Sequence, residues 1–157
     1  MPLSQRAENI YQQISSPTAK MGDLRKIAKE IKKDHELALE LWSTKNFNAQ
    51  LLATLIMDKK LLSQEVLDEL DKDIQTHDYD NRLQLMDWLM ANQLAKDKKT
   101  IALMESWQRS ASALQRRTFW YYQARLRWMG KTEFDNTEAL LDDIERDLLN
   151  EEPEVQW

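Results

Sequence analysis

Turn-forming residues are scarce in this chain, and this scarcity limits the folds that it can adopt. Only two glycines and three prolines occur among 157 residues. Sheets with tight turns need such residues, because turns use the positive φ of glycine or the fixed φ of proline. Leucine, alanine, lysine, glutamate, glutamine and aspartate dominate instead, and most of these favour helix. The sequence therefore predicts an all-α protein.

The predicted helices alternate in character along the chain. A shorter amphipathic helix is followed by a more apolar one three times, around residues 37–57, 66–94 and 101–129. Matching the apolar helices places Ala53, Asp87 and Thr118 at equivalent positions, with spacings of 34 and 31 residues. Helix pairs at such a period are typical of an α-solenoid, in which each pair buries its apolar face against its neighbours. An ordinary helical bundle is the alternative.

Capping residues and apolar periodicity set the expected helix boundaries. The segment at 49–58 is apolar on nearly all sides and is expected to be central. The expected starts are Asp23, Asp34, Asn46 or Asn48, Ser63, Asp80, Asp97, Ser112 and Asn136 or Thr137. The predicted helices lie at residues 2–15, 23–33, 34–43, 46–58, 63–74, 80–94, 97–107, 112–129 and 137–149.

The last predicted helices do not complete a pair. The helix at 137–149 would be the first member of a fourth pair, and the residues from Glu151 to Trp157 would only begin its partner. We therefore expect a single helical-repeat domain over residues 1–157 that lacks the C-terminal helices of a longer protein. An incomplete fourth pair is what we expect of a truncated or engineered form.

Arginines and large aromatic residues are interleaved from Ser112 to Met129, where no acidic residue occurs. At about 3.6 residues per turn, one stripe is suited to a core: Gln115, Phe119, Tyr122, Leu126 and Met129. The opposite side carries Arg117, Tyr121 and Trp128, flanked by Arg116, Trp120 and Arg127. So much aromatic surface predicts either a helix enclosed by other helices or a face that binds an anionic, stackable ligand such as nucleic acid.

Charge is segregated along the chain, although the total of −5 is acidic. The residues from Thr132 to Trp157 carry −9, which leaves +4 for the rest, and residues 101–131 alone carry +5. A basic face for nucleic acid is thus compatible with the acidic total. The cations of the 23–33 helix are expected to form a solvated face: Arg25, Lys26, Lys29, Lys32 and Lys33.

Asp87 is the carboxylate that the pattern places on an apolar helix face. Leu83, Met90 and Leu94 lie within about 60° of it around the helix. A lone carboxylate there is costly to ionise unless a cation or a hydrogen-bond donor meets it. The matched position one repeat later adjoins Arg117, which suggests an Asp87–Arg117 pair across neighbouring helices. Such a pair is either a buried structural ion pair or a carboxylate held in a groove for a cationic species.

Several kinds of catalytic and metal site are excluded by composition. The chain has no cysteine and two histidines, His35 and His77, so it cannot build a zinc cluster, and no motif supports serine–histidine–aspartate chemistry. Gly22 and Gly130 stand alone, which rules out a glycine-rich phosphate loop. No secretory signal and no membrane-spanning run is visible. Together with the lack of cysteine, this leads us to expect a cytoplasmic protein.

Four segments resemble the DNA alkylation repair (AlkD-like) proteins, which are built of HEAT-like helix pairs. In chain order they are MGDLRKIAKEI, FNAQLLATLIMDKK, LMDWLMANQL and SALQRRTFWYYQARLRW. The resemblance extends from about Met21 to Trp157. It implies an α-solenoid, or superhelix, of HEAT-like antiparallel helix pairs.

The resemblance also implies an activity. Enzymes of this family hydrolyse the N-glycosidic bond of cationic N3- or N7-alkylated purines and hold double-stranded DNA in a basic concave groove; no metal or cofactor is implied. The resemblance carries the catalytic carboxylate to Asp87 and the groove arginine to Arg117 or Arg116. Nearby aromatic residues are the further DNA-binding candidates: Trp88, Tyr121 and Trp128.

The chain departs from the family pattern at two aromatic positions. Leu83 stands where the family has an aromatic residue one turn before the acid, and Leu114 stands where it has a tryptophan before the paired arginines. The alternative function is therefore a non-catalytic HEAT-like scaffold that binds nucleic acid or a protein partner through the same surface. A scaffold without activity is the third possibility.

Overall fold

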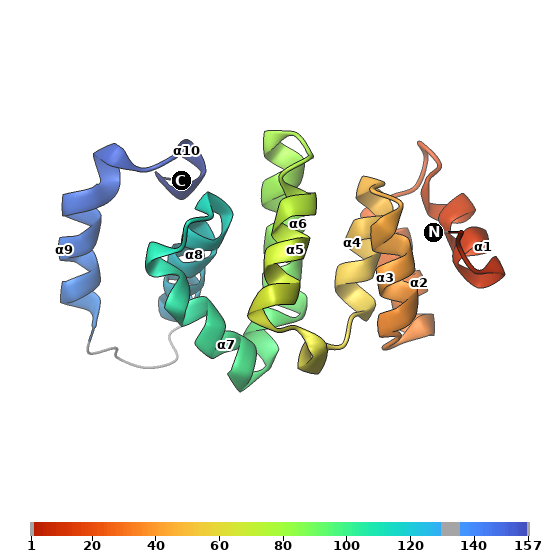
Figure 1. Ribbon diagram of the computed structural model, residues 1–157, viewed down its shortest axis with the longest axis horizontal. Coiled ribbons are helices and arrows are strands. Elements are labelled where there is room, and N and C mark those ends of the chain that lie inside the picture. Colours follow the sequence, from red (N-terminus) through yellow and green to blue (C-terminus); the bar gives the residue numbers. More distant parts are fainter. Residues whose placement is uncertain (1, 130–135, 157) are drawn as a thin grey trace. The chain divides into compact units, whose positions relative to one another are not determined.

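The protein is all-α, as the sequence predicts. The computed structural model describes residues 2–129 and 136–156, and within these ranges every regular element is a helix (Figure 1). None of the helices in these ranges is both long enough and apolar enough to cross a membrane. The α-helices are α1 (Gln5–Ile14), α2 (Met21–Ile31), α3 (His35–Ser43), α4 (Phe47–Ile56), α5 (Gln64–Ile74), α6 (Tyr79–Asn92), α7 (Lys98–Glu105), α8 (Ala113–Trp128), α9 (Thr137–Asp147) and α10 (Pro153–Gln156). Short 3-10 helices are η1 (Lys59–Leu61), η2 (Leu94–Lys96), η3 (Ser106–Arg109) and η4 (Leu148–Asn150).

Several helices begin at the capping residue that the sequence predicts. In each case the side-chain oxygen accepts a hydrogen bond from the backbone N–H three residues later, which satisfies a donor that the helix itself leaves unpaired. These N-caps are Asp34, Ser63, Ser112 and, of the two asparagines expected at the start of α4, Asn46.

Two predicted N-caps are wrong, by three residues for α2 and by two residues for α6. Asp23 is the third residue of α2 and not its cap; its carboxylate reaches back and accepts from the backbone N–H of Lys20 at 2.9 Å. Asp78 rather than Asp80 caps α6. In both places the helix starts earlier and the predicted cap lies in its first turn, where an acidic side chain is favoured by the positive end of the helix dipole.

Residues Met1–Ile101 form the first of two compact units. Its central element is α4, which packs against α3, α2 and α6. Every residue from Ala49 to Thr54 has an exposed fraction of 0 %. Because only a helix covered on all sides buries consecutive residues in this way, the prediction that this segment is central is confirmed.

Carboxamide side chains connect helices within the first unit. Each donates to a carbonyl in the last turn of another helix, where the regular backbone donors four residues later run out. The Trp42 carbonyl also accepts from the backbone N–H of Lys45 at 3.2 Å. The three donor–acceptor pairs are Asn48 Nδ2 to Ile14 O at 2.9 Å, Gln50 Nε2 to Trp42 O at 3.2 Å, and Gln93 Nε2 to Thr54 O at 2.8 Å.

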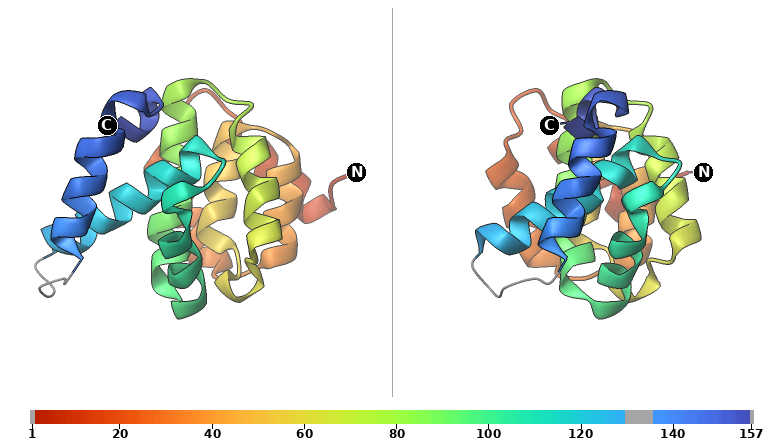
Figure 2. Two further views of the ribbon diagram at one scale, coloured as in Figure 1. Left: turned by 60° about the vertical axis from the view of Figure 1, so that its left-hand side comes forward. Right: turned by 90° about the vertical axis from the view of Figure 1, so that its left-hand side faces the viewer.

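Residues Ala102–Trp157 form the second compact unit. Within it, α8 packs against η3 and α10. Figure 2 shows that the chain turns sharply between α9 and α10. The apolar residues buried in the described part of this unit are few: Met104, Trp107, Leu114, Phe119, Tyr122 and Leu140.

The helical class is thus established for each unit by itself. The stacking of all helix pairs into one α-solenoid stays a prediction, and so does the single domain over residues 1–157.

Candidate functional site

Asp87 lies in the middle of α6, in the first unit. It is half-buried, whereas Met90 on the same helix and Leu94, at the start of η2, have exposed fractions of 1 % and 0 %. Leu83, one turn before the acid, is half-buried as well. Asp87 therefore lies at the edge of the apolar core, neither enclosed by it nor fully exposed.

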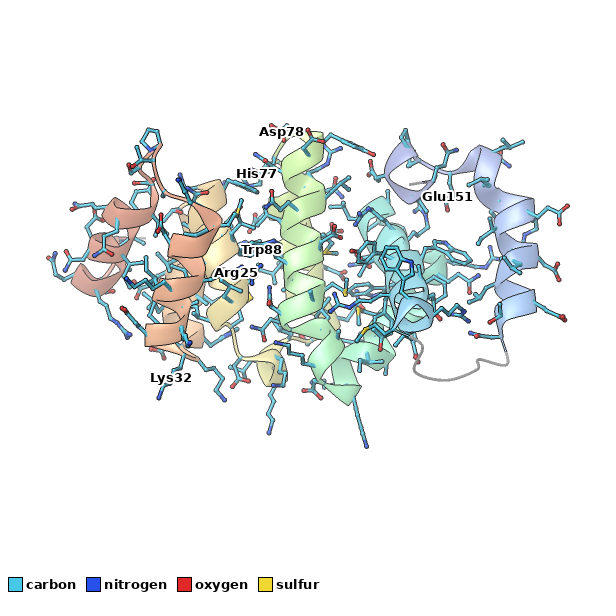
Figure 3. All side chains as sticks on the ribbon, turned by 180° about the vertical axis from the view of Figure 1, so that it is seen from behind. Arg25, Lys32, His77, Asp78, Trp88 and Glu151 are labelled. Atoms are coloured by element: carbon cyan, nitrogen blue, oxygen red, sulfur yellow. The ribbon has the colours of Figure 1, made fainter. Side chains whose placement is uncertain are left out.

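Trp88 follows Asp87 on α6 and contacts α2. The Cζ atom of Arg25 lies 4.5 Å from the centroid of the Trp88 ring, and the two side chains point toward each other (Figure 3). One turn earlier on both helices, Gln84 Nε2 lies 3.5 Å from Met21 Sδ. Going from the first contact to the second moves four residues toward the N-terminus on both helices, so α2 and α6 run in the same direction.

The sequence did not predict the contact of Arg25 with Trp88. The helical pattern places it on the polar side of α2, where the structure also finds it exposed. The pattern does not reveal that this side meets an aromatic ring from a helix far along the chain. The one available signal was Trp88, a large aromatic residue that the helical pattern turns away from the side of Asp87.

The packed side of α8 agrees in part with the predicted stripe. Phe119 and Tyr122 are buried as predicted, with exposed fractions of 5 % and 6 %, and burial raises the pKa of the Tyr122 hydroxyl. Leu114 and Thr118, which the stripe omitted, are buried too. Met129 is 51 % exposed, so its assignment to the core is wrong. The helix ends at Trp128, and Met129 lies beyond the packed segment as its C-cap.

The other side of α8 lines a pocket of about 700 Å³ within the second unit. Arg117, Tyr121 and Trp128 all line it, and they share the side of α8 that faces away from the core, as predicted. The Cζ atom of Arg117 lies 5.2 Å from the centroid of the Tyr121 ring, and Trp128 is 80 % exposed. The facing wall is mainly apolar: Leu140, Leu141, Ile144, Leu148 and Val155.

Arg116 is held by a carboxylate from the segment before α10. Its Nε donates to both carboxylate oxygens of Glu151, at 3.0 and 3.1 Å, and its Nη1 donates to the carbonyl of Ser110 at 2.8 Å. The two charged side chains are only 18 % and 20 % exposed. Of the two arginines predicted to meet DNA, Arg116 is therefore also a structural residue of the second unit.

Carboxylates of α9 lie along the pocket wall. Asp143 and Asp147 both line the pocket and both pair with Arg146. Hydrogen bonds from Arg146 hold the pKa of Asp147 below its usual value. The pocket therefore combines guanidinium groups on the α8 wall with carboxylates, paired with Arg146, on the α9 wall.

The predicted site residues lie in different units. Asp87 and Trp88 belong to the first unit, whereas Arg116, Arg117, Tyr121 and Trp128 belong to the second. The Asp87–Arg117 pair thus stays a prediction. Among the residues that the structure describes, no group of three or more histidine, aspartate or glutamate side chains is arranged to hold a metal ion.

Comparison with known proteins gives one match. A family model described as DNA alkylation repair enzyme matches residues 11–157. A search of curated proteins and a search of solved structures found no significant match. The matched range contains all of the residues described above as candidates.

Proposed function

This chain belongs to the DNA alkylation repair enzyme family, and we propose that it is a DNA N-glycosylase for cationic N3- or N7-alkylated purines in double-stranded DNA. Membership of the family supports a role in DNA alkylation repair. The shared direction of α2 and α6 in the first unit is compatible with the further proposal of HEAT-like helix pairs that stack into a superhelix.

In the proposed reaction, Asp87 acts on the sugar and not on the base. Alkylation gives the purine a positive charge, which makes it a good leaving group. When the bond from C1′ to the purine breaks, its electron pair neutralises the base and positive charge develops on the deoxyribose. The Asp87 carboxylate stabilises this charge and orients the water whose oxygen bonds to C1′, and the proton of that water leaves to the carboxylate or to solvent.

The observation that carries this proposal is the position of Asp87 at the edge of the core. A carboxylate used only for packing would be enclosed, and one used only for solubility would lie on a polar helix face. Asp87 is half-buried between the buried Met86 and Met90 and the half-buried Leu83. Partial burial strengthens its interaction with a nearby cation, because less water screens the charge.

The proposed DNA-binding residues supply cations and aromatic faces. Arg117 and Tyr121 form a cation–π pair on the pocket side of α8, and Trp128 is the most exposed aromatic residue there. Arg116 would contact a phosphate in addition to Glu151 or in its place. Trp88 would act beside Asp87 on α6.

The decisive experiment measures release of 7-methylguanine and 3-methyladenine from methylated duplex DNA. We expect the wild-type protein to release at least one of these bases, and Asp87→Asn to lower the rate by about 100-fold or more. Asp80→Asn is the matched control, since Asp80 is an exposed aspartate on the same helix. No release above a protein-free sample at high protein concentration would contradict the enzymatic proposal.

A non-catalytic scaffold is the second candidate, and Leu83 favours it. The resemblance places an aromatic residue at this position, and the half-buried Leu83 offers no aromatic face to a sugar or a base. If the protein only binds DNA, affinity should still fall steeply with salt, and Arg117→Ala should lower the salt slope by about 1. Binding that is indifferent to salt would indicate a protein partner instead.

A further inference from the structure

The contact between Arg25 and Trp88 differs from an ordinary packing contact in its exposure. Arg25 is exposed and Trp88 is half-buried, so the stacked pair lies at the surface of the first unit. At 4.5 Å, it is closer than the pairs of Arg82 with Tyr79 and of Arg117 with Tyr121, at 5.8 and 5.2 Å. The contact at Met21 and Gln84, one turn away, fixes the spacing of the two helices beside it.

Stacking leaves the donors of this guanidinium available. A cation–π contact attracts the guanidinium as a whole and does not use its N–H donors in conventional hydrogen bonds. In the part of the chain that the structure describes, no carboxylate forms an ion pair with Arg25. Arg116 differs in this respect, because Glu151 already occupies its Nε.

We propose that Arg25 binds a phosphate of the DNA backbone and that Trp88 is the platform that orients it. The planar fork of a guanidinium matches two oxygens of one phosphate. Lys29 is exposed one turn later on α2, and the exposed Lys32 is the C-cap of this helix, so both add positive charge beyond Arg25. Because Trp88 adjoins Asp87, the bound phosphate belongs to the stretch of DNA that contains the reacting nucleotide. This inference rests on the proposed function.

The proposal changes the role of Trp88. The ring face beneath Arg25 is covered, so that face does not stack on a base or a sugar. Trp88 acts through Arg25 and is a positioning residue.

The test measures the affinity for a methylated duplex at several salt concentrations. Arg25→Gln should weaken binding several-fold and lower the slope of log K against log salt by about 1. Lys26→Gln removes the same charge from the next residue of α2, which does not stack on a ring, and should change the slope less. Arg25→Lys should keep the slope and still lose affinity, because an ammonium lacks the planar fork.

A double-mutant cycle tests the platform. Trp88→Leu should reproduce most of the loss seen in Arg25→Gln, and the double variant should be no weaker than Arg25→Gln alone. Trp88→Phe keeps an aromatic face and should bind nearly as the wild type does, which separates stacking from folding defects. Equal slopes for Arg25→Gln and Lys26→Gln, or additive losses in the cycle, would overturn the inference about Arg25. A wild-type protein that does not bind duplex DNA would instead overturn the proposed function, and this inference with it.

Discussion

Two lysines hold backbone conformations that ordinarily favour glycine. Lys32 has a φ of 68° and Lys45 a φ of 59°. In this region Cβ lies too close to a backbone carbonyl, at a cost of about 1–2 kcal/mol. Both residues follow a helix, Lys32 as the C-cap of α2 and Lys45 directly after the C-cap of α3. The chain reverses at these two positions without using either of its glycines.

Replacing Lys45 by glycine should therefore stabilise the protein. We expect the free energy of unfolding to rise by about 0.5–1 kcal/mol, because glycine relieves the backbone strain. The larger conformational entropy of glycine in the unfolded state offsets part of this gain. Chemical denaturation measures the change. Lys26→Gly, inside α2, should instead lower the free energy by about 1 kcal/mol. The same sign for both variants would contradict the argument.

Gln93 should resist replacement by a side chain of similar size. Its side chain is 5 % exposed, and its amide donates to the carbonyl of Thr54. Gln93→Leu leaves that carbonyl without this donor, and we expect a loss of about 1–3 kcal/mol in the free energy of unfolding. Gln12→Leu, at an exposed position of α1, should change it by less than about 0.5 kcal/mol. Equal effects in urea titrations would show that the buried hydrogen bond contributes little.

At the scale of single residues, the sequence predicts on which side of a helix a residue lies better than it predicts which residue that side chain contacts. The helical period correctly places Arg117, Tyr121 and Trp128 away from the core of α8. It cannot identify Arg25 as the partner of Trp88, because that pairing depends on how two helices separated in sequence approach each other.

At the scale of elements, α10 depends on its neighbours. It has four residues, and an isolated helix of that length is unstable in water. Glu154 is 9 % exposed, and Gln156 Nε2 donates to the carbonyl of Leu148 at 2.7 Å. The ion pair of Glu151 with Arg116 connects the start of this segment to α8.

Glu151→Gln should therefore loosen α10. We expect amide hydrogen exchange at residues 154–156 to accelerate several-fold, because removing one partner of a partly buried pair leaves the Arg116 charge poorly compensated. Arg146→Gln is the control. Arg146 is 54 % exposed in its pairs with Asp143 and Asp147, and such pairs contribute little. If both substitutions leave the exchange at 154–156 unchanged, the ion pair does not fix α10.

Periodicity and capping residues predict some helix boundaries and not others. The core helix α4 is found where an apolar segment begins after Asn46. The predicted starts of α2 and α6 are wrong, since α2 begins after Lys20, which is not a typical cap, and two aspartates, Asp78 and Asp80, compete for the cap position of α6. Such competition is decided by backbone geometry, which the residue pattern does not contain.

At the scale of the whole molecule, the two units have unequal cores. The first contains most of the fully buried aliphatic side chains, including those of α4. In the second, Leu141, Ile144 and Leu148 are exposed at the pocket wall. Composition predicts the helical class of both units, but not this inequality, because burial depends on which helices meet.

The second unit should accordingly open first. Native-state hydrogen exchange in low concentrations of denaturant should show α9 and α10 exchanging before α3 and α4, since local opening costs less where fewer apolar contacts are broken. Peptide-resolved mass spectrometry would measure this order. Simultaneous exchange of α9 and α4 at all denaturant concentrations would instead indicate one cooperative structure.

The carboxamide connections of the first unit carry a consequence for the lifetime of the protein. Deamidation of Asn48, Gln50 or Gln93 would replace an N–H donor by a carboxylate that faces a carbonyl oxygen. The new carboxylate and the backbone carbonyl are both acceptors and repel each other, so the hydrogen bond that held the end of the helix is lost. Chemical ageing at any of these three amides would thus weaken the first unit from within, without a change in its length or in its apolar content.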